Sequence, residues 1–184
     1  MLSDDALYAE FLAGKADSFD ELMIRYGDKL TLYLKGYLTE WKDAEDMMIE
    51  AFSRIMFKKP KIEEGNFKVY LFKVGRNLVA SYYRRFKKID SLDVENIANE
   101  AASPESLEES YWNEEKKRIL HLCLDRIDPA TREAIWLVYF ENMSYEDAAA
   151  VMKVNSKKIN NLLTRGKEKL REELAAEGID GYYP

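Results

Sequence analysis

The chain has 184 residues, of which 47% are hydrophobic and 34% are charged, and its formal net charge is −6. This composition is typical of a soluble helical protein with one domain or two small ones, and no apolar run approaches the roughly 18 residues of a membrane span. With 8 glycines and 4 prolines, an all-β fold is disfavoured. The acidic N-terminus is unlike a signal peptide, and the single cysteine, Cys123, excludes an internal disulfide. We therefore expect a cytoplasmic protein without membrane insertion.

Charge is distributed unevenly along the chain. Residues 58–88 contain ten basic side chains and only two acidic ones, whereas residues 89–115 contain nine acidic side chains and no basic one. Binding of nucleic acid depends on a local basic surface more than on a positive net charge. The negative net charge therefore does not exclude a protein that binds nucleic acid. The pattern indicates separate functional zones.

Apolar residues recur at three- and four-residue spacing through the first 88 residues, which predicts a helical bundle. The predicted helices cover residues 5–13, 18–37, 43–59 and 67–86. Ser18 is expected to cap the second helix and Asp43 to open the third. Pro60 is expected to end the third helix, because proline cannot continue the backbone hydrogen bonding, and residues 61–66 are predicted to form a loop.

Residues 89–110 are predicted to form a flexible acidic linker, because Ala, Ser, Asn and Glu dominate and Pro104 breaks regular structure. A second helical domain follows, with helices predicted over 111–127 and from Pro129 onward. The side chains expected on the buried side of that next helix are Trp136, Leu137, Tyr139 and Phe140. The predicted fold class is all-α: two small helical domains, an N-terminal bundle (1–88) and a C-terminal helix-turn-helix domain (111–184), joined by the linker.

The segment 144–171 has the outline of a helix-turn-helix. Ser144 is a good N-cap with acidic residues in the following turn, Lys153-Val154-Asn155 is the expected turn, and Ser156 is expected to cap the second helix. The polar side chains left on the outside of that helix are Lys157, Lys158, Asn160, Asn161, Thr164, Arg165 and Lys167. Amides and guanidinium groups can pair with base edges and lysines can hold phosphates, although an ordinary helical hairpin with a solvated face is the alternative.

The predicted helix from Phe67 to Lys88 interleaves basic residues with aromatic rings. Bases of single-stranded DNA stack on such rings while cations meet the phosphates, although the rings alternatively belong to the core. The acidic linker either serves solubility or imitates nucleic acid in a basic channel. No catalytic motif and no metal or cofactor site is recognisable, since His121 and Cys123 are two residues apart on a helix and lack a second pair. We therefore expect no enzyme and no cofactor.

Several short motifs occur in the order and spacing of one known family. They are Ser18-Phe-Asp-Glu-Leu-Met-Ile-Arg-Tyr26, Asp43-Ala-Glu-Asp46 with Ala51-Phe52, Tyr70-Leu71, Gly75-Arg-Asn-Leu78 with Tyr83-Arg-Arg85, Asp128-Pro129 with Arg132-Glu133, and Ser144-Tyr-Glu-Asp-Ala-Ala149. Together they resemble a bacterial RNA polymerase sigma factor of the extracytoplasmic-function (ECF) group. The chain departs from the family pattern at Ile49, Tyr70 and Ser81, at Leu162, where an arginine is usual, and at Gly166, where alanine is usual.

The resemblance implies that residues 1–88 form a region 2-like domain, which binds core polymerase and the −10 promoter element. Residues 111–184 would form a region 4-like domain, which binds the −35 element, and the linker 89–110 would enter the RNA path of the polymerase. The implied contacts with core polymerase are Glu45, Asp46, Ile49, Glu50 and Arg54.

The implied promoter contacts lie in both domains. Those with the melted −10 element are Lys61, Asn66, Phe67, Tyr70, Arg76, Asn77, Tyr83, Arg84 and Arg85. Those with the −35 element are Ser156, Lys157, Lys158, Asn160, Asn161, Thr164, Arg165 and Lys167. The implied partners are core RNA polymerase, promoter DNA and an anti-sigma factor.

Two rival interpretations remain from the sequence. One is a free-standing helix-turn-helix regulator that does not bind core polymerase, although such a protein has no use for a basic aromatic helix. The other is a sigma-like protein-interaction module whose altered second helix no longer binds DNA.

Overall fold

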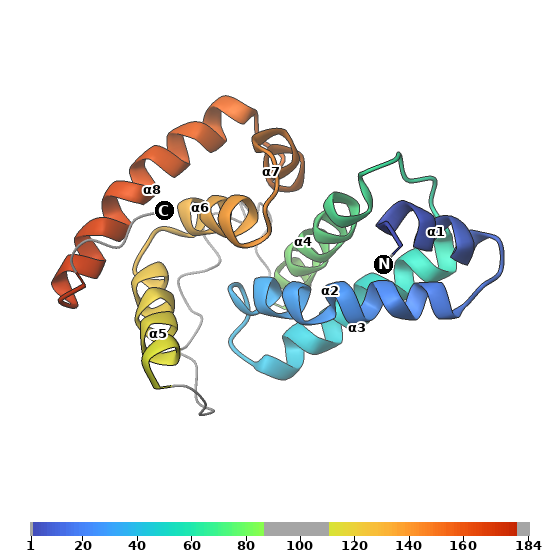
Figure 1. Ribbon diagram of the computed structural model, residues 1–184, viewed down its shortest axis with the longest axis horizontal. Helices are drawn as coiled ribbons and strands as arrows, with labels where there is room; N and C mark the ends of the chain where they lie inside the picture. The colour runs from blue at the N-terminus through green and yellow to red at the C-terminus, as the bar shows by residue number, and fades with distance from the viewer. Residues whose placement is uncertain (1, 87–110, 180–184) are drawn as a thin grey trace.

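The computed structural model describes residues 2–86 and 111–179, and of residue 86 and residues 111–117 it describes the backbone alone. Within these ranges all regular structure is helical, as the predicted all-α class requires (Figure 1). The first group of helices is α1 (Asp4–Leu12), α2 (Asp17–Lys35), α3 (Trp41–Lys58) and α4 (Phe67–Phe86). The second group is α5 (Tyr111–Asp125), α6 (Pro129–Ile135), the π-helical segment η3 (Trp136–Phe140), α7 (Tyr145–Met152) and α8 (Ser156–Ala176). The predicted linker, 89–110, lies outside the described residues.

The first group is a bundle in which α2 packs along α3 and is also in contact with α1 and α4. Its centre is aromatic: Phe19 of α2 meets Phe52 of α3 edge-on, with ring centroids 5.9 Å apart. Both rings are essentially fully buried, as is Leu22. Burying rings of this size is a large favourable contribution to folding, which accounts for the helical spacing of the apolar residues.

The helix ends correct two expectations for the first group. α2 begins at Asp17 after Ala16, so Ser18 is not its cap; the Ser18 hydroxyl instead donates to Glu10 Oε2 at 2.7 Å, because the short connection brings α1 close. α3 begins at Trp41, two residues before Asp43. It ends before Pro60 as predicted, with Lys59 in the left-handed region at φ 43°.

The second group contains the predicted helix-turn-helix. Ser144 caps α7 in a reciprocal capping box with Asp147, and Lys153 forms the turn at φ 58°. The cap of α8 is Asn155, whose Oδ1 accepts from the Lys158 backbone N–H at 2.8 Å, so the expectation that Ser156 is the cap is wrong. Asn155 takes this position because its backbone is still extended, as an N-cap requires.

The prediction for the helix after Pro129 was only partly correct. Leu137 is fully buried, but Tyr139 and Phe140 are each 37% exposed. The five residues of η3 form a π-helical turn, which is wider than an α-helical turn and rotates the following side chains away from the expected face.

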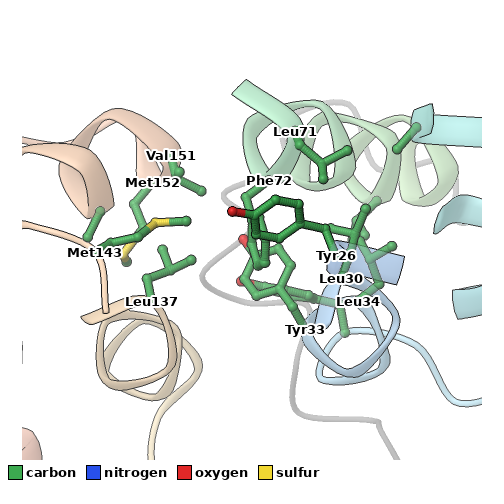
Figure 2. Packing of buried hydrophobic residues seen from close by; sticks show 14 of the residues in the cluster. Tyr26, Leu30, Tyr33, Leu34, Leu71, Phe72, Leu137, Met143, Val151 and Met152 are labelled. Atoms are coloured by element: carbon green, nitrogen blue, oxygen red, sulfur yellow. The ribbon is translucent and has the colours of Figure 1, made fainter. Parts of the chain in front are cut away.

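The two groups touch each other, and α4 lies against α7. Figure 2 shows Tyr33 and Phe72 of the first group facing Leu137 and Met152 of the second across this contact. None of the described helices is long and apolar enough to cross a membrane.

Candidate polymerase and nucleic-acid interfaces

The outer face of α3 carries all five side chains predicted to contact core polymerase, and each of them is at least partly exposed. Arg54 donates through Nε to Glu50 Oε1 at 2.7 Å, one helical turn away. Exposed pairs of this kind contribute little to stability, so the charges are available to a partner.

Exposed apolar side chains accompany these charges on α3, and the sequence motifs pointed only to Ile49 among them. Trp41 (49% exposed), Ile49 (51%) and Phe57 (83%) are spaced by eight residues, which turns each about 80° around the helix axis from the one before. Ile24 of the adjoining helix α2 is also 83% exposed.

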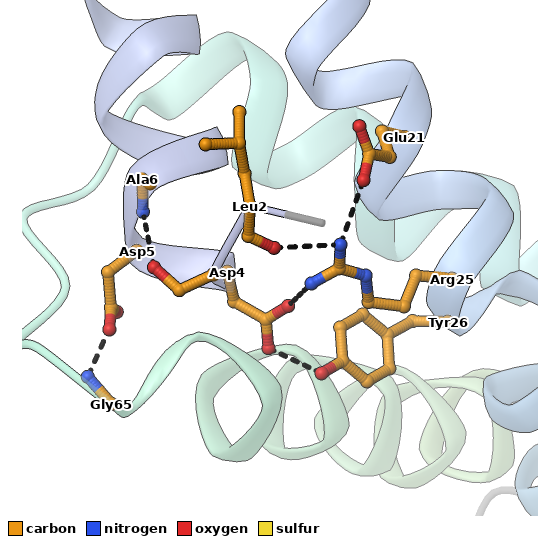
Figure 3. A network of polar contacts seen from close by, with 9 residues as sticks. Leu2, Asp4, Asp5, Ala6, Glu21, Arg25, Tyr26 and Gly65 are labelled. Carbon is orange, nitrogen blue, oxygen red and sulfur yellow. Dashed lines mark hydrogen bonds and ion pairs between the residues drawn. The ribbon is translucent and has the colours of Figure 1, made fainter.

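The loop before α4, residues 61–66, is fastened to α1. The Gly65 backbone N–H donates to Asp5 Oδ1 at 2.9 Å, and the Tyr8 hydroxyl donates to the Pro60 carbonyl at 2.7 Å. Figure 3 shows how the start of α1 is itself held, with Arg25 Nη1 of α2 2.5 Å from Asp4 Oδ1. The predicted −10 contacts in this loop are Lys61, which is exposed, and Asn66, which is half-buried.

Five of the seven predicted −10 contacts on α4 fall into two sets. Arg84 and Arg85 are exposed and Tyr70 is half-buried. Phe67 and Tyr83 instead belong to the core, at 1% and 4% exposure. The Tyr83 hydroxyl also donates to the Tyr37 carbonyl at 2.6 Å, so in this conformation neither of the two core rings is available for stacking with a base.

Arg76 and Asn77, two further predicted −10 contacts on α4, are engaged by the second group of helices. Arg76 Nε lies 2.8 Å from Glu133 Oε1, and Lys153 Nζ lies 2.7 Å from Asn77 Oδ1. Burial alone would lower the pKa of the Arg76 guanidinium, but the Glu133 carboxylate outweighs burial and raises that pKa. The sequence contained no local signal for this partner, which lies 57 residues further along the chain.

The outer face of α8 presents the predicted −35 contacts together. Seven of the eight are exposed and Ser156 is half-buried. Lys158, Asn161, Thr164 and Arg165 line an open groove of about 460 Å³. A helix with amides and cations on one exposed face is suited to reading base edges while holding phosphates.

Both positions at which α8 departs from the family pattern lie on the buried side of the helix. Leu162 is 1% exposed, and Gly166 is buried. Lys167 remains outside, with its Nζ 5.1 Å from the centre of the Tyr139 ring, and the neighbouring Tyr139 hydroxyl raises the pKa of the lysine. The polar face of α8 is therefore continuous although two family positions differ.

Among the described residues, no cluster of three or more His, Cys, Asp or Glu side chains is arranged to hold a metal ion. These residues form three surfaces: a charged and apolar surface on α3, the loop before α4 together with the basic end of that helix, and the polar face of α8. The last belongs to a helix-turn-helix, so the fold and these surfaces define a DNA-binding protein of two helical units.

Comparison with known proteins agrees with this class. Residues 22–89 match the family described as Sigma-70 region 2, and residues 117–170 match Sigma-70, region 4. The ECF RNA polymerase sigma factor SigE of Mycolicibacterium smegmatis is 28% identical over 162 residues, which are 86% of this chain and 62% of that protein. The chain thus spans less than two thirds of that relative, but the 154-residue match to SigM of Bacillus subtilis, at 23% identity, covers 84% of this chain and 93% of SigM.

Solved structures share the fold. The chain superimposes on CnrH, solved in complex with the cytosolic domain of CnrY, with a TM-score of 0.67 at 21% identity over 94% of this chain and 97% of that one. It superimposes on the sigma factor RpoE of Bartonella quintana, solved with the anti-sigma factor NepR, with a TM-score of 0.69 at 22% identity over 90% of this chain and 100% of that one.

The two family matches together cover well over half of the chain, in the order region 2 and then region 4. The chain therefore belongs to the ECF-type sigma factors of the sigma-70 family, which are non-enzymatic and direct RNA polymerase to promoters. The family resemblance seen in the motifs is confirmed.

Proposed function

We propose that this chain binds core RNA polymerase through α3, recognises the −35 element through α8, and captures the melted −10 element through the loop 61–66 and α4. The single observation that carries this proposal is the combination, on one chain matching both sigma regions, of an exposed charged face on α3 and an exposed basic face on α8. In this proposal residues 1–88 form the domain that binds core polymerase and the −10 element, and residues 111–184 form the domain that binds the −35 element. Residues 89–110 join the two domains, and the protein acts in the cytoplasm.

The proposed polymerase surface combines two kinds of contact. Glu45, Asp46 and Glu50 supply negative charge, which steers a basic partner and fixes its register. Ile49 and Phe57 supply apolar area that becomes buried on docking, which is where most binding energy arises. Trp41, at the start of α3, is also exposed and is a residue type enriched at interface hot spots.

The proposed promoter surfaces read DNA in two different ways. On α8, Asn161 and Arg165 line the groove and reach base edges of duplex DNA, while lysines hold the phosphates. Around α4, Lys61, Arg84 and Arg85 provide the cations that hold a single strand after melting. Phe67 and Tyr83 support this surface from the core and do not contact bases in the described conformation.

An anti-sigma factor is part of the proposal. Its support is the fold shared with CnrH and with RpoE of Bartonella quintana, both solved in complexes, the latter with a protein named as an anti-sigma factor. A partner of this kind would compete for the exposed face of α3, because that face carries the largest exposed apolar side chains of the helix.

Capture by purified core RNA polymerase tests the proposal. We expect stoichiometric binding of the wild-type chain and at least tenfold weaker binding of Asp46→Arg, since a buried like-charge contact at the centre of an interface costs about 1.4 kcal/mol or more. Glu168→Arg is the matched control: the same charge reversal at an exposed position of α8 outside the proposed surfaces. A folded wild-type chain that core polymerase does not capture would contradict the proposal and favour the free-standing regulator.

A further inference from the structure

The loop 61–66, which is proposed to capture the −10 strand, is fastened near both of its ends by side chains of α1. The Asp5 carboxylate accepts from the Gly65 backbone N–H at 2.9 Å, and the Tyr8 hydroxyl donates to the Pro60 carbonyl at 2.7 Å. Both bonds join segments that lie more than fifty positions apart in the sequence. The position of the loop therefore depends on α1 as well as on the helices that flank it.

The backbone of the loop needs such a contact at Gly65. This residue is in the left-handed region at φ 78°, and the next residue, Asn66, donates its backbone N–H to the Glu63 carbonyl at 3.1 Å. Glycine adopts the left-handed conformation readily, but it adopts many others as readily, so the residue itself does not select the turn. The hydrogen bond to Asp5 favours the one conformation in which the Gly65 N–H faces α1.

The start of α1 is in turn attached to α2 and to the start of α4. Asp4 accepts from Arg25 Nη1 at 2.5 Å and also from the Tyr26 hydroxyl. The Tyr8 ring is 5% exposed, and its centre lies 5.4 Å from that of Phe67. Figure 3 shows the two neighbouring carboxylates directed to different partners, Asp4 to α2 and Asp5 to the loop. Because α1 is held in this way, it can hold the loop in a fixed place.

The loop still presents side chains to solvent while it is held. Lys61, Glu63 and Glu64 are exposed, whereas Ile62 is half-buried and packs against the core. Selectivity between strands is a difference of affinities, and a loop that is already ordered does not lose that freedom again when the fitting strand binds. A loop free to change shape would bind the fitting strand less tightly and adapt to others.

We propose that α1 is a positioning element for the −10 strand, in which Asp5, assisted by Tyr8, fixes the loop 61–66 in the shape that discriminates between bases. Neither side chain touches DNA in this inference, because both act through the backbone of the loop. The inference rests on the proposed function, since only capture of the −10 strand gives the loop bases to distinguish. Loss of the bond to Gly65 lowers selectivity and leaves the core-binding face of α3 unchanged.

Three variants of the full chain, each in complex with core polymerase, test this role. Asp5→Ala and Asp5→Asn both remove the negative charge, but only asparagine keeps an oxygen that can accept from Gly65. The matched control is Glu10→Ala, because Glu10 lies at the other end of α1. There it accepts from Lys15 Nζ and from the Ser18 hydroxyl, both at 2.7 Å, and it makes no recorded contact with the loop.

The probe is fork-junction DNA, duplex over the −35 element and single-stranded over the −10 element. Its sequence is the one that the complex of core polymerase with the wild-type chain selects from a random library. The competitor differs by one base, at the −10 position that wild type discriminates most strongly. The readout is the ratio of the two dissociation constants, and the affinity of each variant for core polymerase is measured in parallel.

We expect Asp5→Ala to lower this ratio by about threefold to tenfold, the range that one hydrogen bond provides, with unchanged affinity for core polymerase. Asp5→Asn and Glu10→Ala should keep the wild-type ratio. A smaller folded fraction would weaken binding to both strands equally, so the ratio separates positioning from loss of structure. If far-UV circular dichroism shows that Asp5→Ala has lost helix, Tyr8→Phe, which removes the bond to Pro60 and keeps the ring, decides by the same ratio.

An unchanged ratio in a folded Asp5→Ala chain would overturn the inference, and so would an equal loss in Asp5→Asn. In both cases wild type still discriminates between strands, so the proposed function stands. A wild-type complex that selects no −10 sequence would instead contradict the proposed function, and the inference with it.

Discussion

Gly166 shows how a single residue on the DNA-reading helix is set by packing on its other side. A Cβ atom at this position would lie 2.6 Å from Thr131 Cγ2 and 2.9 Å from Ile135 Cδ1. Thr131 and Ile135 are 1% and 3% exposed, so neither has space into which to move. The glycine that replaces the family's usual alanine therefore reflects the close approach of α6 to α8.

We expect Gly166→Ala to lower the free energy of unfolding by about 1–2 kcal/mol. The steric overlap outweighs the gain of about 1 kcal/mol in helix propensity that alanine otherwise gives. The matched control is Gly27→Ala in α2, where the added Cβ would meet Met48 Sδ at an ordinary 3.8 Å and should raise stability by up to about 1 kcal/mol. Urea unfolding of the two variants checks this, and equal shifts of the same sign would refute the packing argument.

At the scale of the element, the start of α8 decides how its polar face is presented. Its first turn has no acidic residue, and the orphan N–H of Lys158 is satisfied by Asn155. Both Asn155 and Ser156 have side chains suited to an N-cap, so local sequence preference did not discriminate between them. The turn before them did, because Lys153 adopts the left-handed conformation and leaves Asn155 as the last extended residue.

Removing each candidate cap in turn tests this assignment. Asn155→Ala should lower the free energy of unfolding by about 1 kcal/mol, because the Lys158 N–H then loses its side-chain acceptor and keeps only the Asn155 carbonyl, at 3.0 Å. Ser156→Ala should change it by less than about 0.5 kcal/mol, since an alanine fits the first helical position well. Thermal unfolding followed by circular dichroism gives both values, and a larger destabilisation in Ser156→Ala would reverse the assignment.

At the scale of the whole molecule, acidic and basic side chains lie on separate surfaces although the net charge is negative. The exposed part of α3 carries acidic groups, whereas the outer face of the first half of α8 carries lysine, arginine and amides. A polymerase and a DNA duplex can therefore be attracted to different parts of one acidic chain. The sequence indicated a basic zone at residues 58–88 and an acidic one at 89–115; the acidic face of α3 and the basic face of α8 are a further separation of charge that the structure shows.

Salt dependence should reveal the phosphate contacts of α8. Promoter binding by the complex of this chain with core polymerase should weaken as salt rises, with a logarithmic slope that scales with the phosphates neutralised. Replacing Lys157, Lys158 and Arg165 with alanine should make that slope shallower by about one unit for each phosphate that is no longer neutralised. Lys169→Ala, on the later part of α8, is the control, and an unchanged slope in the triple variant would favour the protein-interaction module.

The sequence by itself determined the all-helical class, most helix boundaries to within two residues, the helix-turn-helix and the family. Helical spacing, proline stops and capping residues act over a few positions, so their effects can be predicted from short stretches of the sequence. Only the tertiary structure decided which of the predicted contact residues are exposed and which are buried or paired within the chain. It assigned Phe67 and Tyr83 to the core, and it paired Arg76 with Glu133, 57 positions further along the chain. Such partners depend on how whole helices pack, and no local pattern encodes which buried carboxylate an arginine will meet.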